Sequence, residues 1–432
     1  MKVCFVTYDA SQDYVGGVST WERRLLPLLQ SANIELEVHV MAFGGEPGVN
    51  CAAFEKEGIK VRWLAYQWHL PQAVRSLIQL VRESQPDIYV PNCIIPAYYA
   101  GKYVRLSGIP TVGIMHSDDP LHWGIVDEFI IGHPDFRVSV VVPVSRFLES
   151  QIASIAEGRG VMVRRIGYGV PIPPRAAECA NKVFRLVYIG RLVEEQKRIS
   201  DVTKALCGVV ALLPDLEAWI VGEGPARGAV EKMIRQSGVA SRVQLLAGVD
   251  NANIYGVLEQ CHSLVLLSDY EGLPVSVLEA MATGLVPICL DTRSGVREAI
   301  LHGVNGLIVK DRGPDFFAAV RDLQSSPARW QQMSAAARDT ARRHYSIDRC
   351  AHQWIHLLYE LDKQRSGRSD LRAPRPLRLP PPNPKLGALG ASVPWKRRLK
   401  EYVRSKPPVR RMAKSIAVLG RKITRSSIET IL

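Results

Sequence analysis

The chain has 432 residues, of which 47% are hydrophobic and 22% are charged, so it can form two or three globular domains with cores of their own. No apolar run reaches the ~18 residues of a membrane-spanning helix, and the first residues resemble a strand rather than a signal peptide. Eight scattered cysteines without a C-x-x-C motif argue against a disulfide framework or a zinc site, and for reduced thiols in a cytosolic protein.

The net charge of +13 is concentrated at the end of the chain. From Lys363 onward there are 19 Lys or Arg residues and 3 Asp or Glu residues, which is an excess of 16 positive charges. The preceding part therefore carries a net charge of −3. The body and the basic tail of the chain are expected to meet different partners.

The first half of the chain alternates strand and helix signals. Apolar strands are predicted at 2–8, 35–41, 59–64, 87–90, 110–115 and 138–142, and the helical segments between most of them include 19–30, 71–83 and 98–106. Repeated strand–helix–strand units with buried strands predict a parallel, doubly wound sheet. Such sheets bind ligands above the carboxyl ends of their strands.

Two features of this half lie at predicted strand ends. Gly16 and Gly17 follow the first strand, and glycine allows the backbone to approach a phosphate or a sugar closely, although most Gly-Gly pairs are only turns. His116 directly follows the fifth strand, where a lone histidine is more often a satisfied structural residue than a ligand contact. Beyond the sixth strand, Ser145 begins a capped helix, and the Gly- and Pro-rich segment 165–174 is predicted to be an interdomain hinge.

The second half begins a new sheet with the strand 184–190. Arg191 and Lys197 follow this strand, and two cations at a strand-to-helix junction can neutralise a diphosphate, the alternative being ordinary solvated charge. Further strands are predicted within 218–225, 242–248, 263–267, 286–290 and 307–309, and a final amphipathic helix is predicted at 346–361.

The strand at 263–267 leads into the most informative stretch of the chain. Pro274 stands where a first helical residue would, and Gly284 marks the end of the predicted helix. The free N–H groups at the start of such a helix suit a phosphate. Glu271 in the loop, and Glu279 about a turn and a half into the helix, could accept hydrogen bonds from the hydroxyls of a sugar and a ribose. For a lone pair of Glu residues, a surface salt bridge is the alternative.

The segment from Glu271 to Glu279 resembles the E-x7-E motif of retaining nucleotide-sugar glycosyltransferases, in particular glycosyltransferase family four. The tripeptide at 190–192 is similar to the G-R-L of that family, the segment 221–225 is similar to its V-G-x-G-P, and the resemblance covers about residues 1 to 360. It implies the α/β GT-B fold, in which two Rossmann-like, doubly wound parallel-sheet domains face a cleft. The implied divisions are an acceptor-side domain at 1–168, a nucleotide-sugar domain at 169–345, a crossover helix at 346–362, and a Pro-rich linker with a basic amphipathic tail at 363–432.

The resemblance also implies a role for each candidate residue. Arg191 and Lys197 would neutralise the donor diphosphate. Glu271 would orient the hydroxyls of the transferred sugar, and His116 would contact that sugar or support its developing positive charge. These four residues form the predicted catalytic set. The predicted donor-binding set, in which Glu279 holds the ribose, is Gly16, Gly17, Gly272, Leu273, Pro274, Val275 and Glu279.

Two positions depart from the pattern of the family. The interval between Arg191 and Lys197 is one residue longer than usual, and Arg198 is adjacent, so the identity of the second cation is open. Tyr168 precedes Gly169, where members of the family often carry an Asn. The contact that this Asn makes in the family is therefore not expected in this chain.

The implied reaction is the retaining transfer of a hexose from a nucleotide-diphosphate-sugar to a glycan, a lipid or another acceptor, in cell-surface polysaccharide or glycolipid synthesis. No Asp-x-Asp motif occurs, so neither a metal nor a cofactor other than the donor is predicted. Two other functions remain open: a non-catalytic, nucleotide-sugar-binding regulatory subunit at a membrane, and a GT-B-fold sugar-nucleotide epimerase. The sequence leaves open the sugar, the acceptor, and whether the nucleotide is UDP, GDP or ADP.

The segment beyond the resemblance has two parts. Residues 373–384 are rich in proline and are predicted to form an extended spacer. Within 394–425, apolar residues such as Trp395 and Leu399 recur at helical spacing between Lys and Arg, as is typical of a basic amphipathic segment on an anionic membrane surface. A disordered solubilising tail is an equal alternative, and nucleic-acid binding is not expected, because no RNA or DNA motif accompanies the charge. The implied location is cytoplasmic, at the inner face of the membrane if the tail binds it.

Overall fold

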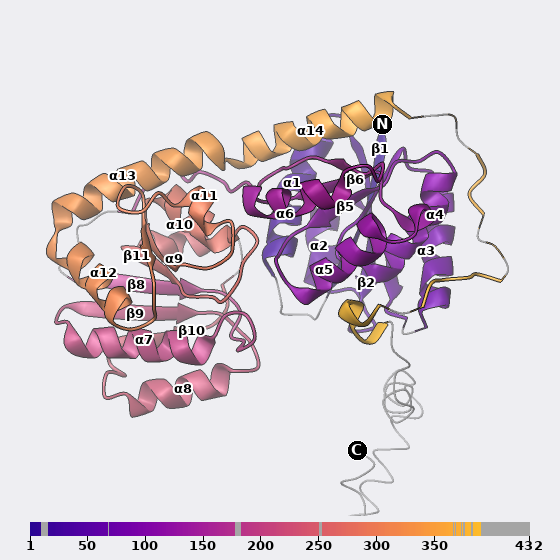
Figure 1. Cartoon of the computed structure of the whole chain (residues 1–432). Helices are drawn as coiled ribbons and strands as arrows, with labels where there is room; N and C mark the ends of the chain where they lie inside the picture. The colour runs from indigo at the N-terminus through magenta and orange to yellow at the C-terminus, as the bar shows by residue number, and fades with distance from the viewer. Residues whose placement is uncertain are drawn as a thin grey trace, which may run out of the picture.

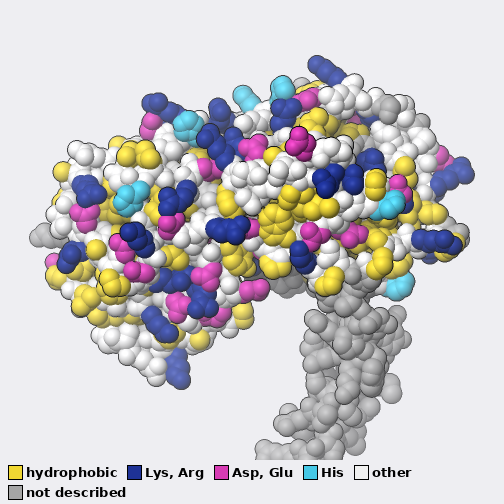
Figure 2. All heavy atoms as spheres, in the orientation of Figure 1, with side chains coloured by type: hydrophobic (Ala, Val, Ile, Leu, Met, Phe, Trp, Pro, Cys, Tyr) yellow, Lys and Arg dark blue, Asp and Glu magenta, His cyan; other side chains and the backbone are white. Residues whose placement is uncertain are grey.

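The computed structural model of the chain describes residues 1–389 except 10–15, 68, 178–182, 250–252, 366, 368, 373, 375 and 382. The described residues form two α/β lobes that lie side by side, and two successive helices, α13 (Pro327–His344) and α14 (Ile347–Lys363), run one after the other across them (Figure 1). On the face shown in Figure 2, basic and acidic side chains are mixed over both lobes, as expected for a body without a large net charge.

The N-lobe is built on parallel strands. They are β1 (Lys2–Asp9), β2 (Glu35–Ala42), β3 (Lys60–Ala65), β4 (Ile88–Pro91), β5 (Val112–Met115), β6 (Val140–Pro143) and β7 (Met162–Val163). Their order is β3-β2-β1-β4 followed by β5-β6-β7, and a parallel bridge between Tyr89 and Thr111 joins the two groups. The chain reverses direction across the sheet between β1 and β4, which creates a switch point at their carboxyl ends.

Helices cover both faces of this sheet. They are α1 (Gly17–Ser31), α2 (Val49–Lys56), α3 (Leu70–Ser84), α4 (Ile95–Leu106), α5 (Pro120–Val126) and α6 (Arg146–Ala156), with short helical turns at Asp127–Ile131 and Pro134–Phe136. The amphipathic α1 buries Trp21, Leu25 and Leu29, because apolar residues three to four positions apart share one helix face. As predicted, Ser145 caps α6, and its hydroxyl accepts a hydrogen bond from the N–H of Leu148 at 3.2 Å.

The C-lobe repeats the same design. Its strands are β8 (Phe184–Ile189), β9 (Leu216–Val221), β10 (Val243–Leu246), β11 (Ser263–Leu266), β12 (Val286–Leu290) and β13 (Leu307–Val309), all parallel in the order β10-β9-β8-β11-β12-β13. The helices are α7 (Ile199–Leu212), α8 (Arg227–Gln236), α9 (Ile254–Leu258), α10 (Val275–Thr283), α11 (Val296–Ala299), α12 (Pro314–Ser325) and α13 (Pro327–His344). The switch point of this sheet lies between β8 and β11, so ligands are expected above the carboxyl ends of these two strands.

A last helix, α14 (Ile347–Lys363), returns from the C-lobe and packs on α1 of the N-lobe (Figure 1). Its Trp354 is buried against Phe5 and Trp21, with ring centroids 6.2 and 5.7 Å away. At its start, the N–H of Ile347 donates to the carbonyl of Val170 at 2.9 Å. The two connections between the lobes, near Val170 and at α14, therefore lie next to each other.

Residues 364–389, which we name the strap, run from α14 along the N-lobe to α5 (Figure 1). The sequence predicts a proline-rich spacer here, but the described part of the strap is docked on the lobe, because Leu371, Leu377 and Leu386 bury their side chains in its core. Near its start, the N–H of Ser369 donates to the carbonyl of Ser107 at 3.1 Å. Its last described turn, Pro384–Leu389, lies against α5. The membrane segment predicted at 394–425 lies outside the described residues.

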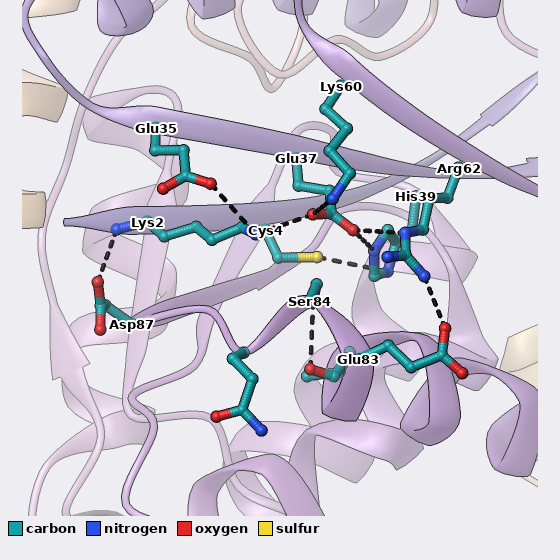
Figure 3. Close-up of polar contacts among 12 residues, drawn as sticks. Lys2, Cys4, Glu35, Glu37, His39, Lys60, Arg62, Glu83, Ser84 and Asp87 are labelled. Atoms are coloured by element: carbon teal, nitrogen blue, oxygen red, sulfur yellow. Dashed lines mark hydrogen bonds and ion pairs between the residues drawn. The ribbon is translucent and has the colours of Figure 1, made fainter.

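A buried ionic network joins the three strands β1, β2 and β3 of the N-lobe (Figure 3). The fully buried Glu37 carboxylate is ion-paired with Lys2, Lys60 and Arg62 at 3.0, 3.0 and 2.9 Å, and it is hydrogen-bonded to His39 at 3.1 Å. Burial opposes its charge, but the hydrogen bonds from His39, Lys2 and Lys60 outweigh burial and lower the pKa of Glu37. Lys2 and Lys60 begin their strands, so the network lies toward the amino ends, away from the ligand edge of the sheet.

Candidate active site

The loop between β11 and α10 is pressed against the N-lobe. A Cβ atom at Gly272 would lie 1.9 Å from the carbonyl oxygen of His116, a distance at which no side chain fits. The carbonyl of Gly272 accepts from the N–H of Gly295 at 2.6 Å, which fixes the other side of the loop. The predicted donor loop is therefore a contact between the lobes, and glycine is required there for steric reasons.

Three of the four predicted catalytic residues lie together at the C-lobe switch point. The Lys197 ammonium is ion-paired with Oε1 of Glu271, and these side chains are only 12% and 9% exposed. Arg191 follows β8 and reaches the same place through Gln196, whose Oε1 accepts from the Arg191 Nη2 at 2.6 Å. Gln196 then donates to Oε2 of Glu271 at 3.3 Å.

The sequence does not predict a role for Gln196, and it leaves the second cation open between Lys197 and Arg198. Gln196 is buried and also donates to the carbonyl of Tyr270 at 3.0 Å, so it holds the loop and Glu271 together. Arg198, the rival of Lys197, turns outward, is 45% exposed and pairs with Asp201 at 2.8 Å. The cation that lies against Glu271 is therefore Lys197.

Glu279 makes a contact that its sequence position does not reveal. Its Oε1 accepts from Nη2 of Arg24, on α1 of the N-lobe, at 2.7 Å. Burial raises the pKa of Glu279, and the charge of Arg24 opposes this rise. Nearby, a Cβ at Gly17 would lie 3.7 Å from Cγ2 of Val275, so the glycine pair after β1 meets the start of α10.

The His116 ring is held by protein groups on both sides. Its Nε2 lies 2.5 Å from Oδ1 of Asn92, and its Nδ1 lies 2.5 Å from the hydroxyl of Tyr168. The amide of Asn92 is oriented by its donation to Glu22 at 2.8 Å, so Nε2 carries the hydrogen and Nδ1 accepts from Tyr168. Burial, aided by the nearby His122, lowers the pKa of His116 well below its usual value. The ring is neutral, and the His116 carbonyl, rather than the ring, faces the Gly272 loop.

Glu22 ends this chain of hydrogen bonds and gives the first prediction. Burial raises its pKa from 4.5 to about 7, against the hydrogen bonds from Asn92 and Thr7. As pH rises from 4.5 to 7, the unfolded chain loses this proton before the folded protein does, so stability falls over that window and is level above it. We expect Glu22→Gln to remove this fall and to be about 3 kcal/mol more stable than the wild type at pH 8.

Urea unfolding of both proteins at pH 4 and pH 8 measures this difference, and the two should be nearly equal at pH 4. Glu231→Gln on α8, where the side chain is 57% exposed, is the matched control and should follow the wild type at both pH values. If wild type and Glu22→Gln keep a constant difference across this range, Glu22 is ionised in the folded protein and the prediction is wrong.

Three other features of the described residues concern metal sites, membrane-spanning helices and disulfides. Within them, no group of three or more His, Cys, Asp or Glu is arranged to hold a metal ion. Among the helices described, none is long and apolar enough to cross a membrane. The cysteines of the described part are free, and Cys179 lies outside it.

Comparisons with known proteins agree with this architecture. Residues 175–340 match the family model of glycosyl transferases group 1. The lipopolysaccharide 1,6-galactosyltransferase of Salmonella typhimurium is 24% identical over 350 residues, which cover 77% of this chain and 92% of that protein. A lipopolysaccharide core biosynthesis glycosyltransferase of Rhizobium meliloti is 24% identical over 277 residues, covering 62% and 74% of the two chains.

Solved structures show the same fold at low identity. HepE of Anabaena, in complex with UDP, has a TM-score of 0.66 and 17% identity, covering 83% of this chain and all of that one. Sucrose-phosphate synthase of Thermosynechococcus elongatus has a TM-score of 0.69 and 15% identity, covering 84% and 99% of the chains.

Two parallel-sheet lobes, with a polar site at the switch point of the C-lobe where the N-lobe meets it, give this chain the GT-B fold of these solved structures. Residues 175–340, the part that matches the model of glycosyl transferases group 1, include β8 to β13 and the Glu271 loop.

Proposed function

We propose that this protein is a glycosyltransferase that moves a hexose, with retention of configuration, from a nucleotide-diphosphate-sugar to a glycan or lipid-linked acceptor in cell-surface polysaccharide or glycolipid synthesis. The observation that carries the proposal is the cluster of Arg191, Gln196, Lys197 and Glu271 above the strands β8 and β11. The relatives that act in lipopolysaccharide synthesis support the acceptor class. The UDP complex of HepE makes UDP the first nucleotide to test.

The chemistry follows from where charge develops. As the bond between the anomeric carbon and the donor phosphate breaks, negative charge grows on the diphosphate, which Arg191, Lys197 and the start of α10 are placed to stabilise without a metal ion. The acceptor oxygen bonds to the anomeric carbon on the same face, and its proton passes to the leaving phosphate. In this proposal Glu271 orients the sugar, Glu279 holds the ribose, and His116 lies beside the sugar as a neutral group.

Donor binding tests the proposal directly. We expect one nucleotide-diphosphate-sugar among UDP, GDP and ADP compounds to bind the wild type selectively in calorimetry. Glu279→Gln should weaken that binding about 10- to 100-fold, because it removes charge-assisted hydrogen bonds to the ribose. Glu231→Gln, on the exposed face of α8, should bind like the wild type.

Product analysis then separates the alternatives. A glycoside whose anomeric configuration equals that of the donor supports retaining transfer, whereas inversion contradicts it. Release of free nucleotide diphosphate without a glycoside would favour an epimerase. If the folded wild type binds none of these nucleotides, the result contradicts the proposal that a nucleotide-diphosphate-sugar is the donor.

We also propose that the basic segment at 394–425 binds an anionic membrane at the cytoplasmic face. The strap supports this proposal, because its last described turn, Pro384–Leu389, is docked against α5 and precedes that segment in the chain. α5 follows β5 and His116, so attachment there would hold the acceptor side of the N-lobe near the lipid surface.

Flotation with vesicles of phosphatidylglycerol and phosphatidylcholine measures membrane attachment. We expect the full chain to float and a chain ending at residue 389 to sink, with flotation lost in ~0.5 M salt because the attraction is between charges. Equal flotation of both chains would remove the membrane role of the tail.

A further inference from the structure

The ion pair between Arg24 and Glu279 is buried between the two lobes. The side chains are 10% and 8% exposed. A Cβ at Gly17, at the start of α1, would lie 3.7 Å from Cγ2 of Val275, at the start of α10. The ion pair between Arg24 and Glu279 lies about two turns into α1 and one turn into α10. Closure of the lobes therefore places an N-lobe cation on the carboxylate proposed to hold the ribose.

Only part of the Arg24 guanidinium is satisfied. Nη2 donates to Oε1 of Glu279, but Nη1 is shut off from solvent and has no hydrogen-bond partner among the described residues. Within the same part of the chain, no group donates to the second carboxylate oxygen of Glu279. A buried N–H donor without an acceptor costs free energy of folding. The ion pair therefore lacks a group that accepts a hydrogen bond from Nη1 of Arg24 and donates one to Glu279.

The guanidinium is held in place from the C-lobe. Its carbon lies 5.8 Å from the ring centroid of Tyr255, on α9. The Tyr255 hydroxyl donates to the carbonyl of Pro171 at 3.1 Å, in the segment that joins the lobes. Arg24 thus contacts a tyrosine that is itself tied to the segment joining the lobes.

We propose that Arg24 is a second ribose-binding residue of the donor site and that it acts from the opposite lobe. This inference rests on the proposed function, in which Glu279 holds the ribose. A ribose hydroxyl can donate to the free oxygen of Glu279 and accept from Nη1 of Arg24, which completes both groups. Because Nη1 is shut off from solvent when the lobes meet, the ribose binds to the open form, and Arg24 closes over it.

Calorimetry with UDP, 2′-deoxy-UDP and 3′-deoxy-UDP tests this arrangement. We expect the wild type to bind one of the deoxy nucleotides about 10-fold more weakly than UDP, because the missing hydroxyl leaves both protein groups unpaired. Arg24→Gln should bind UDP about 10-fold more weakly than the wild type, and its preference for UDP over that deoxy nucleotide should fall to about 2-fold or less.

Two further variants separate ribose binding from simple adhesion of the lobes. Arg164→Gln removes an exposed ion pair with Glu360 on α14, at 2.9 Å, and should leave UDP binding unchanged. The exchange of Arg24→Glu with Glu279→Arg keeps an ion pair between the lobes but should not restore the preference for UDP over the deoxy nucleotide.

Three results would overturn the inference. The first is unchanged or tighter UDP binding by Arg24→Gln. The second is weaker UDP binding by Arg24→Gln with the full preference for UDP over the deoxy nucleotide retained. The third is full recovery of that preference when Arg24→Glu is combined with Glu279→Arg. If the wild type binds neither UDP nor any other nucleotide tested, the result contradicts the proposed function as well as the role of Arg24. If the wild type binds UDP normally, the results with the variants test the role of Arg24 alone.

Discussion

Arg191→Ala is expected to lower the turnover number about 1,000-fold and to leave the thermal unfolding midpoint within about 2 °C of the wild type. The guanidinium is exposed, and its hydrogen bond to Gln196 is not needed to hold Glu271, because Gln196 also bonds the Tyr270 carbonyl. Folding therefore survives the change. The diphosphate, in contrast, loses a full positive charge at the moment when its own negative charge grows.

The measurement is a steady-state assay with the donor that calorimetry identifies, with circular dichroism melting as the check on folding. Arg198→Ala is the matched control, since Arg198 lies seven positions later in the same connection but is 45% exposed and paired with Asp201. We expect its turnover to stay within about 2-fold of the wild type. Wild-type turnover by Arg191→Ala, or an equal loss in both variants, would show that the charge at residue 191 is not used in catalysis.

The sequence predicts much of this site because two neighbouring strands deliver it. Arg191 and Lys197 follow β8, Glu271 follows β11, and parallel strands that pair must end at the same edge of the sheet. Apolar runs in the sequence locate both strands. The resemblance to a known motif is needed only to assign roles to the three residues. The gathering of Arg191, Lys197 and Glu271 is thus a consequence of local signals and simple topology.

Residues that act through their amide or hydroxyl groups were harder to foresee. Gln196 lies between Arg191 and Lys197, yet a glutamine carries no charge and no motif, so only its contacts show that it connects Arg191 to Glu271. Tyr168 departs from the family pattern, in which an Asn is common at this position. Its contact with His116 depends on how the segment 165–174 runs past the end of β6, where the N–H of Ile166 donates to the carbonyl of Pro143 at 3.3 Å, and no periodicity encodes this path.

Contacts between the lobes lie beyond sequence reasoning altogether. Arg24 and Glu279 are 255 residues apart, and their meeting depends on the relative placement of two domains that fold on separate sheets. The strap shows the same limit. Its prolines predict an extended chain, but the burial of Leu371, Leu377 and Leu386 depends on a matching surface on the N-lobe.

The contact between Gly272 and His116 gives the second large expected effect. Gly272→Ala places a carbon 1.9 Å from the His116 carbonyl oxygen, where real Cβ atoms keep at least 3.0 Å. The loop and the N-lobe must therefore move apart by about 1 Å, and a misplacement of that size between reacting groups costs about 100-fold in rate. We expect kcat/KM to fall at least that far. The C-lobe has a core cluster of its own, and the sheet of the N-lobe is packed by its own helices, so the variant should still fold.

Two glycines make the comparison decisive. Gly228→Ala on α8 adds a methyl group where nothing lies within 4 Å, and it should behave like the wild type or be slightly more stable, because alanine favours a helix. Small-angle scattering of Gly272→Ala should show lobes that are farther apart than in Gly228→Ala when the nucleotide is present. Normal turnover by Gly272→Ala would show that the reaction does not require the close contact between the backbones of Gly272 and His116. Loss of turnover with unchanged scattering would place the fault in the Glu271 loop instead of in closure.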